Sequence, residues 1–287
     1  MKSIVLSSVF MLFGITAIGQ EKSFDYFGLD LPGEKVKIFA PGIVSSKGSD
    51  EYCVTISPVG DEVFFARGVW PESKIMHVKK INNRWAEPQI ASFSADCYAS
   101  EPAFSPDGKY LYFSSSKGKD DIKDYSIWRV ERSGNNWDNA KKVIDFTNPY
   151  TWEFHPSITN DGTVYFCYWE SKKNKGSIYK SEHQNGIYTE PLKVNIPFNE
   201  GSSIVNPFVD PAVKYIIVSS AIYGDKSGYD VFISNRQKGA WLAPCNIGKR
   251  YNVSGDDITF DVSPDGRYFF MYRQGDVYWT ETNGVLK

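Results

Sequence analysis

The chain has 287 residues, of which 16% are aromatic and 23% are charged, and its formal net charge at pH 7 is −2. A nearly neutral chain lacks the broad positive field that a phosphate backbone requires, so nucleic acid is excluded as an expected partner. Abundant Tyr and Phe with few helix-favouring blocks favour pleated, half-buried strands, and therefore an all-β fold.

Residues 1–19, MKSIVLSSVFMLFGITAIG, have the layout of a secretory signal peptide. Lys2 precedes an apolar run, and the stretch ends in small residues. The run is too short to span a bilayer comfortably, and no later segment is apolar enough to do so. We expect cleavage near Gly19, which would leave residues 20–287 as one domain in the periplasm or the extracellular space.

Five copies of a short turn recur along the rest of the chain with a period of about 50 residues. They are SPVG at Ser57, SPDG at Ser105, TNDG at Thr159, DPAV at Asp210 and SPDG at Ser263. In S-P-D-G, Pro presets the φ angle of a type I turn, and Gly takes a left-handed position that suits a β-branched residue poorly. The period predicts a repeat architecture.

Each turn joins two predicted strands, and a third strand follows after a loop of variable length. The second strands are rich in aromatic residues, as in EVFFAR (62–67) and RYFFMYR (267–273). An aromatic residue then opens a fourth strand in four of the units, and we assign this series to packing: Trp85, Trp137, Tyr188 and Trp241. Four antiparallel strands per unit without a helix predict the blades of a β-propeller.

The two ends of the chain predict how the propeller closes. The fifth unit ends soon after its third strand at 276–280 and lacks a fourth. Residues 34–42, EKVKIFAPG, look like a fourth strand without the three that should precede it. Radial closure protects sheet edges that an open stack would expose. We therefore predict a five-bladed β-propeller of four-stranded blades, with the last blade closed by the N-terminal strand.

The repeat core FSPDGKYLYFSS, followed by a short third strand, resembles the WD-like propeller repeat of TolB and its relatives in bacterial envelopes. The opening IFAPGIVSS is also similar to that of secreted propellers of this group. The resemblance covers about residues 24–287 and implies a binding or scaffold protein of the envelope. The fourth copy, DPAV, departs most from the pattern, so its hairpin is the least well specified.

No standard catalytic signature is present in the sequence: there is no G-x-S-x-G, phosphate loop, H-E-x-x-H or EF-hand run. The three histidines fall in different units, and none has a Cys or a second His at metal-ligand spacing. We therefore expect no metal and no cofactor. The four cysteines (Cys53, Cys97, Cys167 and Cys245) leave any disulfide pairing open, and buried free thiols are the favoured interpretation.

Candidate site residues follow from position, because the first strand of each propeller blade lines the central channel. Four residues before each turn lie Cys53, Glu101, His155, Asn206 and Thr259. Six residues before each turn lie Glu51, Ala99, Glu153, Ile204 and Asp257. With a period of two, both sets would share one strand face and form two stacked rings at the channel mouth. Tyr98, Trp152 and Asp256 would lie just above them.

The predicted ligand-binding residues are Glu51, Glu101, Trp152, Glu153, His155, Asn206 and Asp257. The carboxylates would accept hydrogen bonds, His155 would be a pH-sensitive donor, and Trp152 would offer a stacking face. A structural alternative is that these inner polar groups bond to neighbouring blades and to water in the channel.

Three classes of function remain open, because fold alone does not choose among them. The favoured one is a non-catalytic binding or scaffold propeller, expected to be a monomer, for a small molecule, a glycan or an envelope protein. The second is a glycosidase-like enzyme that uses Glu101, Glu153 and Asp257, because five-bladed propellers also carry glycosidases. Against it, Cys53 and Thr55 stand where such an enzyme would be expected to have an inner-strand Asp. The third is a purely structural domain.

Overall fold

The computed structural model describes residues 24–117, 126–144, 146, 150–222, 228–253 and 255–286. The expected signal peptide, residues 1–19, lies outside the described residues. In the part of the chain that is described, no helix is long and apolar enough to cross a membrane.

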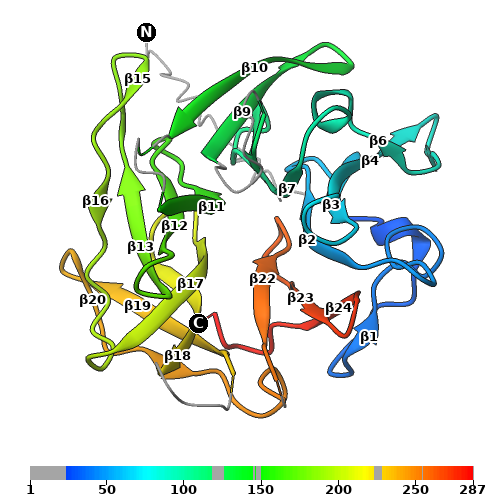
Figure 1. Cartoon of the computed structure of the whole chain (residues 1–287). Helices are drawn as coiled ribbons and strands as arrows, with labels where there is room; N and C mark the ends of the chain where they lie inside the picture. Colours follow the sequence, from blue (N-terminus) through cyan, green and yellow to red (C-terminus); the bar gives the residue numbers. More distant parts are fainter. Residues whose placement is uncertain are drawn as a thin grey trace, which may run out of the picture.

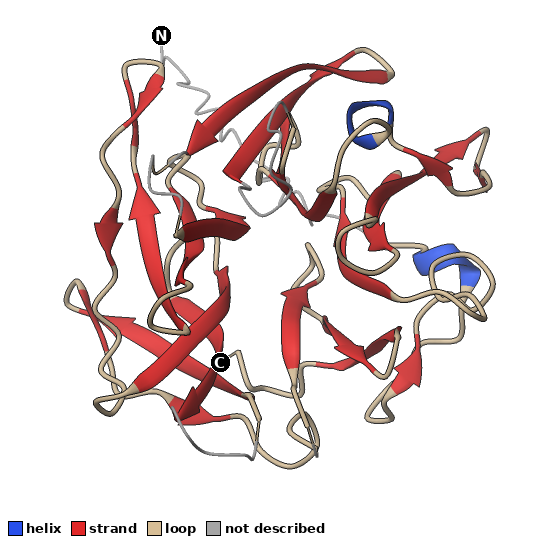
Figure 2. Ribbon diagram, viewed as in Figure 1, coloured by secondary structure: helices blue, strands red, loops and turns tan. Residues whose placement is uncertain are grey.

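Five antiparallel sheets surround a central axis as the blades of a propeller, which confirms the predicted fold class (Figure 1). Figure 2 shows that strands and loops make up nearly all of it, with two short 3₁₀ helices, η1 (Tyr26–Gly28) and η2 (Ser92–Ser94). The strands, from the innermost outward in each blade, are as follows: blade 1, β2 (Glu51–Ile56), β3 (Glu62–Arg67), β4 (Lys74–Ile81), β5 (Arg84–Trp85) and β6 (Gln89–Ile90); blade 2, β7 (Ala99–Phe104), β8 (Tyr110–Ser115), β9 (Ser126–Ser133) and β10 (Asn136–Ile144); blade 3, β11 (Thr151–Ile158), β12 (Val164–Glu170), β13 (Lys175–Ser181) and β16 (Leu192–Lys193), with the separate hairpin β14 (His183–Gln184) and β15 (Ile187–Tyr188); blade 4, β17 (Ser202–Val209), β18 (Tyr215–Ile222), β19 (Asp230–Gln237), β20 (Ala240–Trp241) and β21 (Cys245–Asn246); blade 5, β22 (Ile258–Val262), β23 (Tyr268–Arg273), β24 (Asp276–Glu281) and β1 (Lys37–Ile38).

The N-terminal strand closes blade 5, as predicted. β1 pairs antiparallel with β24, with Lys37 opposite Trp279 and Ile38 opposite Tyr278. Beyond the strand, the Phe39 N–H donates to the Val277 carbonyl at 2.8 Å. The outer edge of β24 is therefore covered by a segment more than 230 residues away in sequence.

One apolar cluster fills each of the five interfaces between neighbouring blades. The second strands lie between two such clusters, which is why β3 is buried along nearly its whole length. The once-per-blade aromatic residues pack against these clusters, as Trp137 does between blades 1 and 2. The cluster between blades 5 and 1 includes Phe39 and Trp279, so the closing segment also supplies part of the core.

The repeated turn forms in all five blades, including the divergent fourth copy. Gly108 and Gly266 both have φ of +71°, the left-handed conformation predicted for the glycine of this turn. In the fourth copy Val213 occupies that position with φ of +58°, and its N–H still donates to the Asp210 carbonyl at 2.7 Å. The fourth hairpin therefore tolerates a β-branched residue in a strained conformation.

A buried carboxylate links blades 1 and 2 electrostatically. Glu62 is fully buried, with Lys79 Nζ at 3.0 Å and Arg132 Nη2, from β9 of blade 2, at 2.7 Å. Burial alone would raise the pKa of Glu62. The close approach of His77 and Lys79 and the charge of Arg132 outweigh this and lower the pKa to about 2.

Replacement of Phe39 tests the closure. Its ring is fully buried, with centroids 4.8 Å from Phe270 and 5.2 Å from Trp279. Phe39→Ala should lower the free energy of unfolding by about 3–5 kcal/mol, measured by urea denaturation. Leu31→Ala, at a side chain that is 47% exposed, is the control and should change it by less than about 0.5 kcal/mol. Equal stability of the two variants would contradict the closure.

Glu62→Gln tests the buried ion pair through pH. Because the folded pKa lies below the ordinary value, the carboxylate stabilises the fold above about pH 4.5 and loses this effect as the pH falls toward 2. The variant should be about 2–3 kcal/mol less stable than wild type at pH 7, and this difference should shrink progressively below pH 4.5. Thermal unfolding measured from pH 2.5 to 7 checks this. A stability difference that is independent of pH would show that the ion pair is not its cause.

Candidate functional site

Every inner strand carries a β-bulge at the same place. The pairing register between the first and second strands shifts in all five blades, between Tyr52 and Thr55 in blade 1 and at the equivalent positions elsewhere. The residue four before the turn is left-handed in each case: Cys53 (φ +52°), Glu101 (+57°), His155 (+54°), Asn206 (+51°) and Thr259 (+55°). None of them is glycine, so the bulge is imposed by the assembled blade rather than by residue type.

The bulge changes which side chains reach the channel. One extra residue breaks the two-residue alternation, so residues four and five before the turn, rather than four and six, contribute to the pocket at the channel mouth. This pocket, the mouth pocket, has a volume of about 340 Å³ and is lined by Asp50, Tyr52, Gly68, Val69, Trp70, Glu101, Phe154, Asn206, Ile258, Thr259 and Tyr272. The predicted geometry of two stacked rings is therefore wrong for the upper ring.

The carboxylates of the upper ring are engaged in contacts away from this lining. Glu51 Oε1 accepts from Arg67 Nε at 2.8 Å and also binds Ser46 and Ser49. Asp257 Oδ2 accepts from the Val253 N–H at 2.7 Å. These contacts fix the loops that lead into the inner strands.

Glu153 of the upper ring and Trp152, predicted just above it, also lie outside the lining of the mouth pocket. Glu153 is buried, and its Oε2 accepts from the Phe146 N–H at 3.4 Å. Trp152 is half-buried and lies opposite Trp169 of β12, and β11 contributes Phe154 to the mouth pocket instead.

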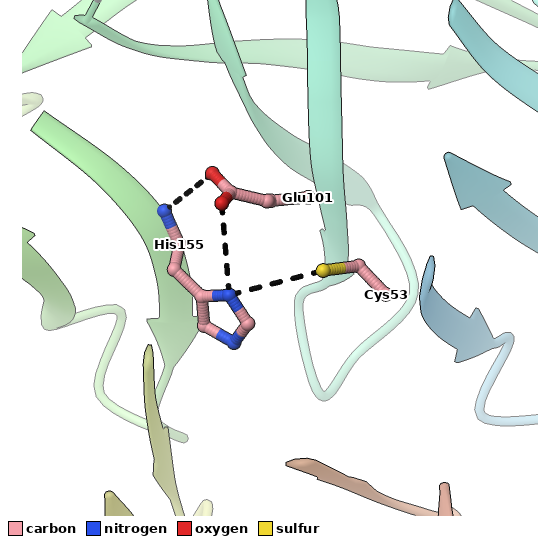
Figure 3. A group of neighbouring side chains, drawn as sticks. All are labelled: Cys53, Glu101 and His155. Carbon is pink, nitrogen blue, oxygen red and sulfur yellow. Dashed lines mark hydrogen bonds and ion pairs between the residues drawn. The ribbon is translucent and has the colours of Figure 1, made fainter. Parts of the chain in front are cut away.

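The lower ring, in contrast, brings three chemically active side chains together from blades 1, 2 and 3. Cys53, Glu101 and His155 each present a ligand atom, and these atoms all lie within 4.8 Å of one another (Figure 3). The Cys53 Sγ lies 3.9 Å from His155 Nδ1, and the Glu101 Oε1 lies 4.0 Å from the same nitrogen. From blade 4, Asn206 Nδ2 approaches His155 Nδ1 at 3.0 Å.

A network of hydrogen bonds fixes the Glu101 carboxylate. Its Oε2 accepts from Ser114 Oγ at 2.5 Å and from the main-chain N–H of His155 at 2.9 Å. That N–H belongs to the bulge of blade 3, so Glu101 satisfies a backbone donor of the neighbouring blade. This is the kind of contact that the structural alternative predicted for inner-strand polar groups.

Burial determines the protonation states of the titratable side chains in the channel. It raises the pKa of Glu101 to about 7, although the bonds from Ser114 and His155 oppose the rise. Burial, with the Glu101 charge, raises the pKa of Asp261 to about 8. It lowers the pKa of His155 to about 3, so the imidazole is neutral at pH 7, and it raises the pKa of the Cys53 thiol.

The opposite end of the channel is built mainly from the turn residues. Pro58, Pro106, Pro211 and Pro264 line a second cavity there, also of about 340 Å³, and Asp261 lies in its wall. Thr55 and Ser157 accept main-chain hydrogen bonds from the next blade, at 3.3 and 2.8 Å. This end therefore combines turn packing with inter-blade bonding.

Sequence reasoning missed several residues of the site. Tyr52 and Phe154 lie one residue before the bulge, where an unbroken two-residue period would point them away from the channel. Trp70 and Tyr272 come from loop and second-strand positions. Asp261 was not a candidate. All four cysteines are free: Cys53 and Cys167 are buried, Cys97 is half-buried and Cys245 is exposed.

Comparison with known proteins identifies the fold. No protein-family model and no curated sequence matches the chain. Among solved structures, TolB from Acinetobacter baumannii is similar with a TM-score of 0.51 and 18% identity over 84% of this chain and 54% of that one. The native arabinanase Arb43A from Bacillus subtilis has a TM-score of 0.51 and 11% identity over 84% of this chain and 97% of that one.

The sheet topology defines the class of protein as a five-bladed β-propeller, and the similarity to TolB confirms the predicted TolB-like architecture. The chain spans about half of the TolB chain. At identities this low, the likeness concerns the fold alone.

Proposed function

We propose that this chain is a non-catalytic binding propeller that takes a small ligand, foremost a glycan, in the mouth pocket. The observation that carries the proposal is the composition of that pocket. Tyr52, Trp70, Phe154 and Tyr272 contribute aromatic side chains, and Glu101, Asn206 and Thr259 contribute polar groups from the ring of bulges. Concave sites with mainly apolar walls and a few placed polar groups are typical of small-molecule recognition.

A sugar ring matches this arrangement because it has an apolar C–H face and a rim of hydroxyl groups. The aromatic side chains would pack against the apolar face, and Trp70, which is 48% exposed, is accessible from solvent. The Glu101 carboxyl and the Asn206 amide would pair with hydroxyls. The volume of about 340 Å³ lies within the range of about 300–1,000 Å³ usual for ligand sites.

The other predicted site residues have supporting roles in this proposal. Glu51 and Asp257 hold the loops that frame the mouth pocket, through Arg67 and the Val253 N–H respectively. Glu153, Trp152 and His155 would act from behind the lining, with His155 oriented by Asn206.

We also propose that residues 20–287 form one exported, monomeric domain that acts in the periplasm or at the cell surface. The N-terminal sequence of residues 1–19 and the resemblance of the repeats to envelope propellers support this. An envelope protein could then be a partner as well as a glycan.

A glycosidase-like enzyme is the second candidate, and it rests on Glu101. A carboxyl with a pKa near 7 that lines an open pocket suits a general acid. Glycoside hydrolysis needs a second carboxyl on the same pocket. The other two carboxylates predicted for an enzyme, Glu153 and Asp257, are buried and bonded to main-chain N–H groups, so the second carboxyl that the pocket lining supplies is Asp50.

The test is a panel of soluble oligosaccharides screened against the mature chain by calorimetry and tryptophan fluorescence. Trp70→Ala and Asn206→Ala should each weaken binding about tenfold or more, which corresponds to about 1.4 kcal/mol. Leu242→Ala is the control, because this side chain is 43% exposed but lies at the outer strands of blade 4. Binding that both pocket variants leave unchanged would place the site elsewhere.

Product analysis in the same panel separates the two candidates. A binding protein returns each oligosaccharide intact. Turnover that Glu101→Gln abolishes, while affinity persists, would overturn the non-catalytic proposal in favour of the enzyme. Failure of every oligosaccharide to bind would exclude a glycan as the ligand.

A further inference from the structure

The ring of bulges gathers metal-binding atoms from three blades at one level of the channel. Cys53 offers a sulfur, Glu101 an oxygen and His155 a nitrogen, all within 4.8 Å of one another. They come from β2, β7 and β11, which are about 50 residues apart in sequence. Figure 3 shows the three side chains converging on a common space.

We propose that Cys53 Sγ, Glu101 Oε1 and His155 Nδ1 form a binding site for a zinc-class divalent cation. A donor set of one thiolate, one imidazole and one carboxylate suits Zn²⁺ and related first-row ions. It does not suit Ca²⁺ or Mg²⁺, which take oxygen ligands. Three protein ligands leave a tetrahedral ion one open position.

The ligand atoms are already oriented toward one another. Glu101 uses Oε2 for the bonds from Ser114 and the His155 N–H, and its Oε1 remains directed at the imidazole. The Asn206 amide nitrogen lies 3.0 Å from His155 Nδ1 and can only donate, so this contact favours the tautomer in which Nδ1 carries a lone pair. That lone pair is the one that a metal ion requires.

The distances need only a small contraction to hold an ion. At metal–ligand distances of about 2.0–2.3 Å, tetrahedral geometry separates neighbouring ligand atoms by roughly 3.3–3.6 Å. The Sγ–Nδ1 and Oε1–Nδ1 separations are 3.9 and 4.0 Å. The third separation, between the sulfur and the carboxylate oxygen, is at most 4.8 Å. Closing the site around an ion would require rotation about the side-chain bonds, and Asn206 would move away from Nδ1.

Charge balance favours a divalent ion in this buried place. Binding would form one bond each to sulfur, oxygen and nitrogen and release the thiol proton to solvent, together with the Glu101 proton where that carboxyl is protonated. The thiolate and the carboxylate then neutralise the two positive charges.

The site is separate from the stacking surface of the mouth pocket but shares Glu101 with it. An ion held here would lie beneath the pocket, with the buried Thr259 hydroxyl beside the Cys53 thiol. The inference does not depend on the proposed ligand. Trp70→Ala should impair oligosaccharide binding and leave metal binding intact, so the two proposals can fail independently.

The experiment is a titration of chelator-treated mature protein with Co²⁺ and then Zn²⁺, followed by absorption spectroscopy. One equivalent of Co²⁺ should produce a thiolate-to-cobalt charge-transfer band, and Zn²⁺ should displace it. Cys53→Ser should abolish the band, and Glu101→Gln and His155→Gln should each weaken Zn²⁺ binding at least tenfold. Circular dichroism of each variant confirms that the fold is retained.

Cys245→Ser provides the matched control, because this thiol is exposed on β21 and distant in sequence from the three ligands. It should keep both the band and the affinity. Absence of the band in wild type would overturn the proposal even if a variant failed to fold. Persistence of the band in folded Cys53→Ser, or its loss in Cys245→Ser, would also overturn it.

Discussion

A left-handed residue in each inner strand is the constraint on which the channel depends. The φ angle lies between +51° and +57° at all five positions, although the residues are Cys, Glu, His, Asn and Thr. Such a conformation costs free energy in a residue other than glycine, most of all in β-branched Thr259. This unfavourable conformation occurs once in each of the five blades, and the resulting bulges determine which side chains line the mouth pocket.

The fold could be predicted because its signals are local and repeated. The turn and the aromatic second strand recur in every unit, and the spare N-terminal strand supplies the fourth strand that the last unit lacks. A weak signal in one unit can therefore be recognised from the other units. Val213 illustrates the limit of that reasoning. A β-branched residue is unfavourable in the left-handed conformation, yet Val213 adopts it. Its side chain packs against the cluster between blades 3 and 4, and its N–H donates to the Asp210 carbonyl. Tertiary context overrides the local preference there.

The site could be predicted only in part, for a physical reason. Counting from the turn found Glu101 and Asn206, because the bulge stands at a constant distance from it. The two-residue period then placed Glu51 at the channel mouth, but the bulge brings its neighbour Tyr52 into the pocket lining instead. No shared residue type signals the bulge, since Asn206 and His155 are of types enriched at φ above zero but Cys53, Glu101 and Thr259 are not. The ionic contact between Glu51 and Arg67 could not be inferred from spacing either.

The structural and functional interpretations of the inner polar residues are compatible, and Glu101 shows how. One carboxylate oxygen accepts hydrogen bonds from the Ser114 hydroxyl and from the main-chain N–H of His155 in the bulge of blade 3. The fold requires such a partner for a buried backbone donor. The other faces the His155 imidazole and the Cys53 thiol. A buried carboxylate that the assembly needs is therefore also held in a fixed orientation, with one oxygen available for chemistry. Because the same bulge recurs in every blade, the fold places one such side chain per blade at the same depth, and the residue types at these positions determine what the channel can bind.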